Sequence, residues 1–203
     1  LLLEKNLPVA SGIGGGSADA AAAIRAFERL AERRLAPERR AAIALSLGAD
    51  VPVCLASRPA VMAGIGERVQ ALAAGVLPSL PVVLARPPVA VPTVEVFRRL
   101  TRRDNPGLPP LPARFRGPAD VAGWLAVTRN DLADPAIAWA PEIATVLDAL
   151  GSARDALAAR LSGSGATCFG LFPDRAAAEA AAAAIGRARP DWWVVATETG
   201  PAA

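Results

Sequence analysis

The chain has 203 residues, of which 53% are apolar and 4% aromatic, and it contains no tyrosine and no histidine. This length allows one ordinary domain or two small ones. Its formal charge of +3 comes from 22 basic and 19 acidic residues that are spread along the sequence. This pattern does not indicate a nucleic-acid surface, and a mildly positive balance suits a phosphorylated small molecule as a ligand.

Neither cysteine, Cys54 or Cys168, stands in a metal-ligand spacing, and without histidine a zinc site would need carboxylates throughout. We expect both cysteines to be buried small hydrophobic residues in a reducing compartment. The sequence has no run of about 18 strongly apolar residues and no charged segment leading into an apolar one. It therefore predicts a soluble, cytoplasmic protein with no membrane partner.

The first predicted element is an amphipathic helix over residues 17–34, because Ala20, Ile24, Phe27 and Ala31 recur at spacings of three and four. A second helix is expected from Pro37, a residue favoured in a first turn, to glycine 48. Because proline 52 disfavours helical geometry in the residue before it, residues 50–52 are predicted to form a turn. Short β-like runs follow at residues 60–63, 68–72 and 80–85.

The second half of the chain begins after a break near residues 77–80. Residues 102–118 contain five prolines and two glycines and are predicted to form a surface loop. Helices are expected over residues 121–127 and 141–150. The last part predicts a strand over 168–172, a helix over 174–187 with Asp174 as its N-cap, and a strand over 192–197. Trp192 and Trp193 are interpreted as packing residues on opposite faces of that strand.

Residues 8–18 read PVASGIGGGSA and lead directly into the first predicted helix. Glycine costs backbone entropy, so four glycines between residues 12 and 16 need a reason. A tight turn is one reason. The other is that backbone N–H groups approach a ligand where no Cβ stands in the way. Since the loop runs into a helix N-terminus, with its unpaired donors and positive dipole end, the sequence favours a phosphate site.

Two familiar nucleotide motifs do not fit this loop. A P-loop needs a lysine before its final serine or threonine, whereas Gly16 runs directly into Ser17. A dinucleotide fingerprint needs a third glycine where this chain has Ser17. The loop is therefore a different kind of phosphate-binding turn.

Lys5-Asn6-Leu7-Pro8 and the glycine loop together resemble the ATP-binding loop of the GHMP small-molecule kinases. Further segments resemble that family in the expected order: LGADVP at 47–52, GIGE at 64–67, Val91-Pro92-Thr93 with Phe97, RNDL at 129–132 and LSGSGAT at 161–167. The resemblance covers nearly the whole chain. Several motifs in order are far more specific than a single glycine loop.

The resemblance implies an α+β fold with GHMP kinase architecture. Residues 1–78 would be the C-terminal part of the ATP-binding domain, a ribosomal-S5-domain-2-like half that lacks its first strands, and residues 79–203 would be a ferredoxin-like C-terminal domain. The family's lysine-bearing N-terminal strand and its Tyr-His turn have no counterpart here, and the chain begins with leucine rather than methionine. We therefore expect an N-terminally truncated kinase.

The activity implied is transfer of the γ-phosphoryl group of ATP, with Mg²⁺, to a hydroxyl of diphosphocytidyl-methylerythritol, a precursor in the non-mevalonate isoprenoid pathway. Asp50 would be the catalytic carboxylate, although its local sequence alone reads as a turn former at a helix end. The nucleotide would be held by Lys5, Pro8, Val9, Ala10, Ser11, Gly12, Ile13, Gly14, Gly15, Gly16, Ser17 and Ala18.

The acceptor would be bound, by the same resemblance, by Thr93, Phe97, Gly163, Ser164 and Gly165. For Thr93 and Phe97 a helix N-cap and a core aromatic are equally good interpretations. The loop over residues 162–167 could instead be a plain tight turn. Asn130 and Asp131 are expected to fix a helix terminus rather than touch substrate.

Two other functions remain open. Another GHMP enzyme, such as a homoserine, mevalonate or galactose-type kinase, would share the glycine loop and differ in its acceptor pocket. A non-catalytic ATP-binding module would bind nucleotide without turnover. A serine hydrolase is disfavoured, because the GxSxG elbow is absent and the chain has no histidine to act as the base.

Overall fold

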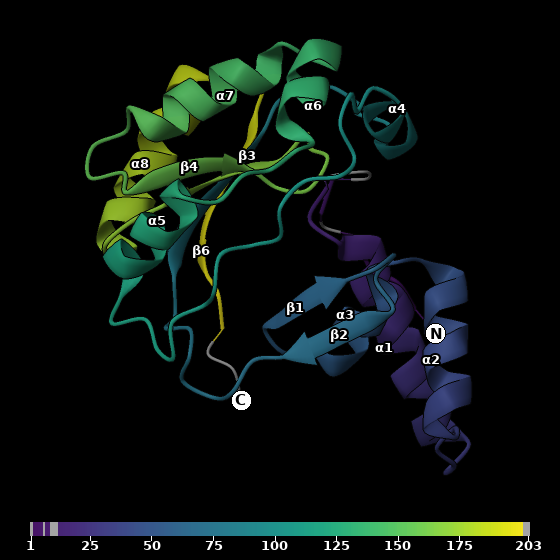
Figure 1. Cartoon of the computed structure of the whole chain (residues 1–203). Helices are drawn as coiled ribbons and strands as arrows, with labels where there is room; N and C mark the ends of the chain where they lie inside the picture. The colour runs from purple at the N-terminus through teal and green to yellow at the C-terminus, as the bar shows by residue number, and fades with distance from the viewer. Residues whose placement is uncertain (1, 6, 9–11, 201–203) are drawn as a thin grey trace. The chain divides into compact units, whose positions relative to one another are not determined.

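The computed structural model describes residues 2–5, 7–8 and 12–200 (Figure 1). The chain divides into two compact units. Unit 1 is formed by Gly14–Ala74 with the residues before Pro8, and unit 2 by Pro8–Ile13 with Gly75–Pro201. The family-domain boundary after residue 78 stays a prediction.

Unit 1 consists of three helices and a β-hairpin: α1 Gly15–Leu30, α2 Pro37–Leu47, α3 Val51–Ala56, β1 Ala60–Ala63 and β2 Arg68–Ala71. The hairpin is antiparallel, with Ala60 opposite Ala71. Its small core contains Ala21 and Ile24 of α1, Ala44 of α2 and Val51 of α3. The small alanine side chains allow the helices to pack closely while burying little apolar area.

The predicted boundaries in unit 1 are confirmed closely for α2, which begins at Pro37 and ends against Gly48. Helix α1 begins two residues earlier than predicted and ends at Leu30 rather than at residue 34. The predicted turn over residues 50–52 is wrong, because α3 begins at Val51. Pro52 stands in the first turn of that helix, where the missing N–H would have had no helical acceptor.

Unit 2 contains an antiparallel sheet of four strands in the order β4-β5-β3-β6 (Figure 1). The strands are β3 Pro81–Arg86, β4 Ala158–Leu161, β5 Cys168–Leu171 and β6 Trp193–Glu198. Helices separate β3 from β4, and one helix separates β5 from β6, so the unit has the βαββαβ connectivity of ferredoxin-like folds. The predicted α+β class is confirmed.

The helices of unit 2 are α4 Thr93–Arg98, α5 Pro118–Ala126, α6 Ala133–Trp139, α7 Glu142–Gly151 and α8 Arg175–Ala188. The main core joins Val83 of β3, Val146 and Leu150 of α7, and Ile185 of α8. The N-cap prediction for α8 is confirmed, since the Asp174 carboxylate accepts a hydrogen bond from the Ala177 N–H at 2.8 Å. The loop predicted between α4 and α5 contains no helix or strand over residues 102–117.

All four tryptophans lie in unit 2. Trp124 packs edge-on against Phe115, with ring centroids 6.2 Å apart. Trp192 is half-buried against the main core, as predicted, but it precedes β6 rather than lying on it. The Arg189 guanidinium lies 5.0 Å from its ring centroid. Trp139 donates to the Ala90 carbonyl at 3.3 Å.

The two cysteines are free thiols in different environments. Cys168 is buried in unit 2, and burial raises its pKa to about 12. Cys54 is only half-buried, so the prediction of burial is confirmed for Cys168 alone. The pKa of Cys54 is raised by partial burial and by the nearby Asp50 carboxylate, and Arg25 has a smaller, opposing effect. Among the described residues, no helix has the length and apolar character needed to cross a membrane.

Candidate active site

The glycine loop leads into α1 through a left-handed residue. Gly14 is the N-cap with φ +73°, and no side chain caps the helix. The first helical hydrogen bond runs from the Ala18 N–H to the Gly14 carbonyl at 2.9 Å. The N–H groups of the first turn, at residues 15–17, therefore have no acceptor within the helix, and the first turn carries no acidic side chain. This end of α1 has the donors and the dipole that favour an anion.

The glycines of this loop differ in whether their backbone conformation or their surroundings require glycine. Gly14 needs its left-handed conformation, whereas Gly16 lies within the helix. A Cβ at Gly16 would meet nothing within 4 Å. Gly16 is the second residue of α1, where glycine has no conformational advantage over alanine, so local packing gives no reason for it here. Close approach of a ligand to the backbone would give one.

The other nucleotide candidates lie around this loop. The Lys5 ammonium forms an ion pair with the Asp19 carboxylate of α1, and both side chains are more than a third exposed. Pro8 and Ile13 are half-buried, and Ala18 is exposed. The candidates Val9, Ala10 and Ser11 lie outside the described residues. The contacts of all these residues with a nucleotide stay predictions.

Asp50 is exposed and directly precedes α3. Its side chain makes no capping hydrogen bond, so the turn-former interpretation leaves the carboxylate without a local structural task. A Cβ on Gly66 would lie 2.3 Å from the Ala49 carbonyl oxygen. The GIGE turn therefore packs closely against the residue before Asp50, which brings two of the predicted motifs together in unit 1.

The second glycine loop connects β4 and β5 in unit 2. Its backbone is closed by hydrogen bonds from Ser162 N–H to the Thr167 carbonyl and from Gly165 N–H to the Ser162 carbonyl, each 2.9 Å. Gly163 and Gly165 have φ values of +54° and +87°, in the left-handed region that favours glycine. Ser164 is buried, and its hydroxyl lies 2.8 Å from the Thr93 hydroxyl.

The alternatives for Thr93 and Phe97 do not match their positions. The N-cap of α4 is Pro92, Thr93 is the first helical residue, and its hydroxyl is engaged by Ser164. Phe97 is 47% exposed and lies outside the core. Four of the five acceptor candidates thus lie together in unit 2, because Gly163, Ser164 and Gly165 are consecutive and Ser164 contacts Thr93.

The two glycine loops also meet within unit 2. The Ser162 hydroxyl donates to the Gly12 carbonyl at 3.0 Å. A Cβ on Gly12, whose φ is +74°, would lie 2.2 Å from the Gly165 carbonyl oxygen. Sequence reasoning did not assign Ser162 this role. The two residues are 150 positions apart, and no local pattern connects them.

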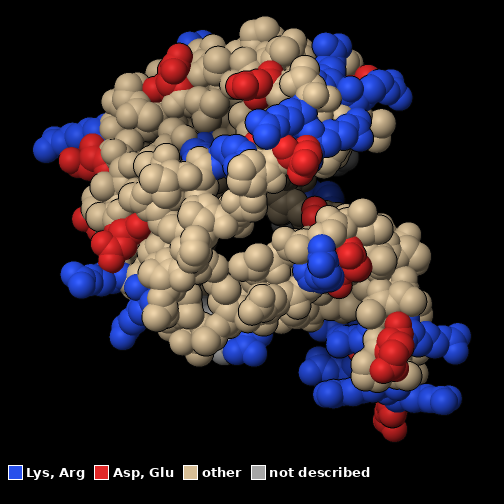
Figure 2. Space-filling model, in the orientation of Figure 1, with Lys and Arg blue, Asp and Glu red and all other residues tan. Residues whose placement is uncertain are grey.

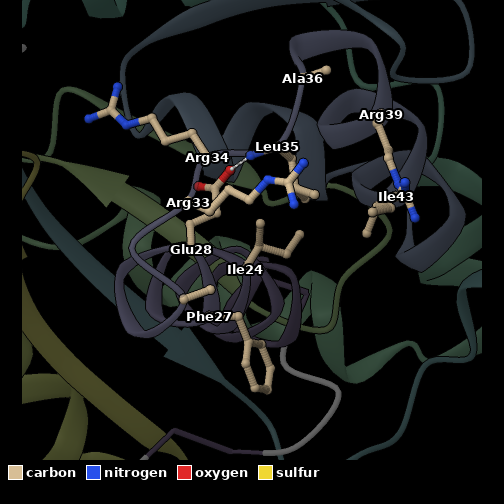
Figure 3. A pocket seen from close by; sticks show the side chains of 10 residues that line it. Ile24, Phe27, Glu28, Arg33, Arg34, Leu35, Ala36, Arg39 and Ile43 are labelled. Carbon is tan, nitrogen blue, oxygen red and sulfur yellow. Dashed lines mark hydrogen bonds between the residues drawn. The ribbon is translucent and has the colours of Figure 1, made fainter.

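A separate groove of about 570 Å³ lies between α1 and α2 (Figure 3). Apolar side chains and arginines line it, and the Glu28 carboxylate accepts from the Leu35 N–H at 3.1 Å. An adjacent groove is lined by Arg25, Arg29, Arg33, Arg34 and Arg40. Figure 2 shows Lys and Arg side chains crowded at one end of the surface in this view. Neither groove contains a predicted site residue.

Comparison with known proteins matches the two parts of the chain to two domains of one family. The N-terminal domain model of the GHMP kinases matches residues 1–58, and the C-terminal model matches residues 117–191. A curated relative from Cereibacter sphaeroides, named 4-diphosphocytidyl-2-C-methyl-D-erythritol kinase, is 54% identical over 194 residues, which cover 96% of this chain and 68% of the relative. The chain belongs to the GHMP kinase family. The predicted family resemblance is confirmed.

Other members of the family support the same relationship. A Rhizobium etli protein of the same name is 56% identical over 97% of this chain, and the match covers 64% of that protein, slightly less than two thirds of its length. A crystal structure of 4-(cytidine 5'-diphospho)-2C-methyl-D-erythritol kinase is 34% identical with a TM-score of 0.77, covering 98% of this chain and 70% of that one. Homoserine kinase from Cytophaga hutchinsonii, at 16% identity and a TM-score of 0.58, shares the fold.

Proposed function

We propose that this chain carries the phosphoryl-transfer site of a kinase that uses ATP to phosphorylate a hydroxyl of 4-diphosphocytidyl-2-C-methyl-D-erythritol. The names of the relatives support the acceptor. The observation that carries the reaction type is the uncapped first turn of α1 behind the glycine loop. The proposal places the enzyme in the cytoplasm, where ATP is available, acting on a small molecule rather than on nucleic acid or membrane.

The first turn of α1 would hold the ATP phosphates. Backbone N–H groups there point out of the helix, and the helix dipole adds to their attraction for anions. Mg²⁺ usually keeps several waters and binds through one or two protein oxygens together with substrate phosphates. The half-buried Ser17 hydroxyl makes no cap bond in the described part of α1, so it fits as one such oxygen ligand. The ion would neutralise phosphate charge as the γ-phosphoryl group moves.

Asp50 would accept or orient the proton of the attacking hydroxyl. A general base must be accessible and ionised, and Asp50 is exposed with no capping bond to satisfy it. Its charge is felt by Cys54, whose pKa it raises.

The acceptor would bind along the second glycine loop of unit 2. Gly163 is exposed and presents backbone there without a side chain, and Ser164 is held in place by Thr93. Phe97, half-exposed one turn after Thr93 on α4, offers an aromatic face on which the cytosine ring could stack. These contacts would explain why a cytidine-bearing acceptor is chosen.

The test compares Asp50→Asn with the parent chain. The substitution keeps the side-chain size and removes the charge. Turnover measured by mass spectrometry of the phosphorylated product should fall by a factor on the order of 10² to 10⁴. ATP affinity measured by titration calorimetry should change by less than about threefold. Asp148→Asn, at an exposed position on α7, is the matched control and should leave both values unchanged.

Each competing function has its own outcome in this assay. The parent chain is assayed beside a fusion to the part of the Rhizobium etli relative that the match leaves out. If both bind ATP and neither phosphorylates any acceptor, the protein is a nucleotide-binding module. If homoserine or a sugar is phosphorylated and the cytidine compound is not, the acceptor assignment is wrong.

A further inference from the structure

Asn130 lies between α5 and α6, and both the NH₂ group and the oxygen of its side-chain amide form hydrogen bonds with backbone groups. Its Nδ2 group donates to the Leu161 carbonyl at 3.2 Å and to the Gly163 carbonyl at 2.8 Å. Its Oδ1 accepts from the Leu132 N–H at 3.0 Å. Two carbonyls face one end and an N–H faces the other, so these partners determine the orientation of the amide. The expected helix-terminus role accounts for the bond to Leu132 alone.

The backbone on both sides of Asn130 is held by other elements of unit 2. The Arg160 guanidinium on β4 donates to the Leu125 carbonyl at 2.7 Å and to the Thr128 carbonyl at 3.2 Å, just before Asn130. On the other side, the Asp131 carboxylate accepts from the Asn105 side-chain amide, in the loop between α4 and α5, at 3.0 Å. The half-buried amide of Asn130 is therefore presented to the loop from a fixed support.

The two carbonyls that Asn130 binds lie on either side of Ser162 in the sequence. Ser162 contacts Gly12 through its hydroxyl, and Ser164 contacts Thr93 through its own. Gly163, whose φ of +54° lies in the left-handed region that favours glycine, separates these two serines in the chain. The hydrogen bonds from Asn130 to two carbonyls of this loop add to the two backbone hydrogen bonds that close it.

We propose that Asn130 is a positioning residue of the phosphoryl-transfer site, which fixes the second glycine loop so that Ser162 meets the nucleotide loop and Ser164 meets Thr93. The inference rests on the proposed function of that loop. Asn130 touches no reacting atom. It acts through the backbone of Leu161 and Gly163, and misplacement of a site by about 1 Å can reduce a rate by about 100-fold.

The test uses two variants of Asn130. Asn130→Ala removes the whole amide. Asn130→Asp keeps the shape and the acceptor for the Leu132 N–H, but an ionised carboxylate cannot donate to the two loop carbonyls. The control is Asp174→Ala, which removes the α8 N-cap bond and lowers the stability of the same unit without touching the loop.

We expect kcat to fall by roughly 10- to 100-fold in both variants, with a smaller change in KM for ATP, because the first turn of α1 is intact. Asp174→Ala should keep kcat within about twofold of the parent. In ¹⁵N-resolved spectra the amides of Gly12, Gly163 and Gly165 should shift in both Asn130 variants and stay in place in the control.

Values of kcat within about twofold of the parent in both Asn130 variants would overturn the proposal, whatever the amides do. Equal losses of kcat in Asp174→Ala would overturn it too, because a general loss of stability would then explain the effect. Absence of turnover in both the parent chain and the fusion refutes the proposed function instead. In that case the ¹⁵N-resolved spectra alone test the positioning role of Asn130. Unshifted amide signals of Gly163 and Gly165 in the Asn130 variants would overturn it.

Discussion

Gly12 and Gly16 are two glycines of one loop for which the structure predicts opposite effects of a methyl group. A Cβ on Gly12 would lie 2.2 Å from the Gly165 carbonyl oxygen and 2.8 Å from its carbonyl carbon. Both contacts are with backbone, which cannot rotate away as the end of a side chain can. A Cβ on Gly16 would meet nothing within 4 Å.

The cost of Gly12→Ala has two parts. A left-handed φ of +74° costs a non-glycine residue about 1–2 kcal/mol, and overpacking adds about 1–3 kcal/mol. If the loop stays in place, the free energy of unfolding should fall by about 2–5 kcal/mol. If the loop detaches, the loss is the Ser162–Gly12 hydrogen bond, worth about 1 kcal/mol. A detached loop should also lower the affinity for ATP, on the proposed function of this loop.

Gly16→Ala should separate stability from binding. Alanine in place of glycine stabilises a helix by up to about 1 kcal/mol, which raises Tm by roughly 2–4 °C for a chain of this size. If the phosphates lie against this backbone, the added methyl group should weaken ATP binding roughly tenfold, equivalent to about 1.4 kcal/mol. Scanning calorimetry gives the first quantity and titration calorimetry the second.

One result would refute the reasoning about each glycine. A Gly16→Ala variant that binds ATP as tightly as the parent would show that no ligand approaches this turn of α1. A Gly12→Ala variant with unchanged Tm and unchanged ATP affinity would show that the two glycine loops do not meet as described. The pair therefore tests the ligand site and the loop contact independently.

Three further predictions concern the thiols and a helix cap. Iodoacetamide at pH 8 should alkylate Cys54 before the buried Cys168. Asp50→Asn should speed alkylation of Cys54, because loss of the carboxylate lowers the raised pKa of the Cys54 thiol. An unchanged rate in Asp50→Asn would contradict this electrostatic coupling. Burial raises the pKa of Cys168 from 9.0 to about 12. The contribution of this thiol to the free energy of unfolding is therefore complete below pH 9 and declines as pH rises from 9 towards 12. Over that range the free energy of unfolding should depend less on pH in Cys168→Ala than in the parent. Asp174→Ala should cost about 1 kcal/mol by chemical denaturation, whereas Asp174→Asn should cost a few tenths at most, and equal losses would exclude the cap bond to the Ala177 N–H as the cause.

Much of the fold could be predicted from local patterns. The proline at the start of α2 and the glycine at its end act through the backbone of the helix itself, and the Asp174 cap does the same for α8. Strand β1 was predicted with its observed bounds, and β2, β3, β5 and β6 within about one residue. These features depend on chemistry that lies within a few residues of the element.

Some elements were missed because they depend on contacts distant in sequence, and others because a proline was taken as a helix breaker. Strand β4, Ala158–Leu161, has an alanine-rich sequence without a strand pattern, and its extended form is set by pairing with β5. Helix α6, Ala133–Trp139, contains Pro135, which a local reading takes as a breaker but which the first turn accepts. Helix α3 was missed for the same reason.

The candidate site shows the same limit. The motifs that contain Gly12, Asp50, Thr93 and Ser164 could each be found in the sequence. Which of them touch could not, because the contacts of Ser164 with Thr93 and of Ser162 with Gly12 span 71 and 150 positions. Asn130 carries no local signal for its bond to Gly163, since a loop asparagine is ordinarily a turn or cap residue.

The distribution of aromatic residues gives the two units different optical properties. All four tryptophans lie in unit 2, and the chain has no tyrosine, so intrinsic fluorescence excited near 295 nm reports on unit 2 alone. Far-ultraviolet circular dichroism, by contrast, receives signal from the helices of both units. A denaturation followed by both signals would therefore reveal whether the units unfold together. Coincident curves indicate one cooperative transition, and a dichroic change without a fluorescence change identifies unit 1 as the part that melts first.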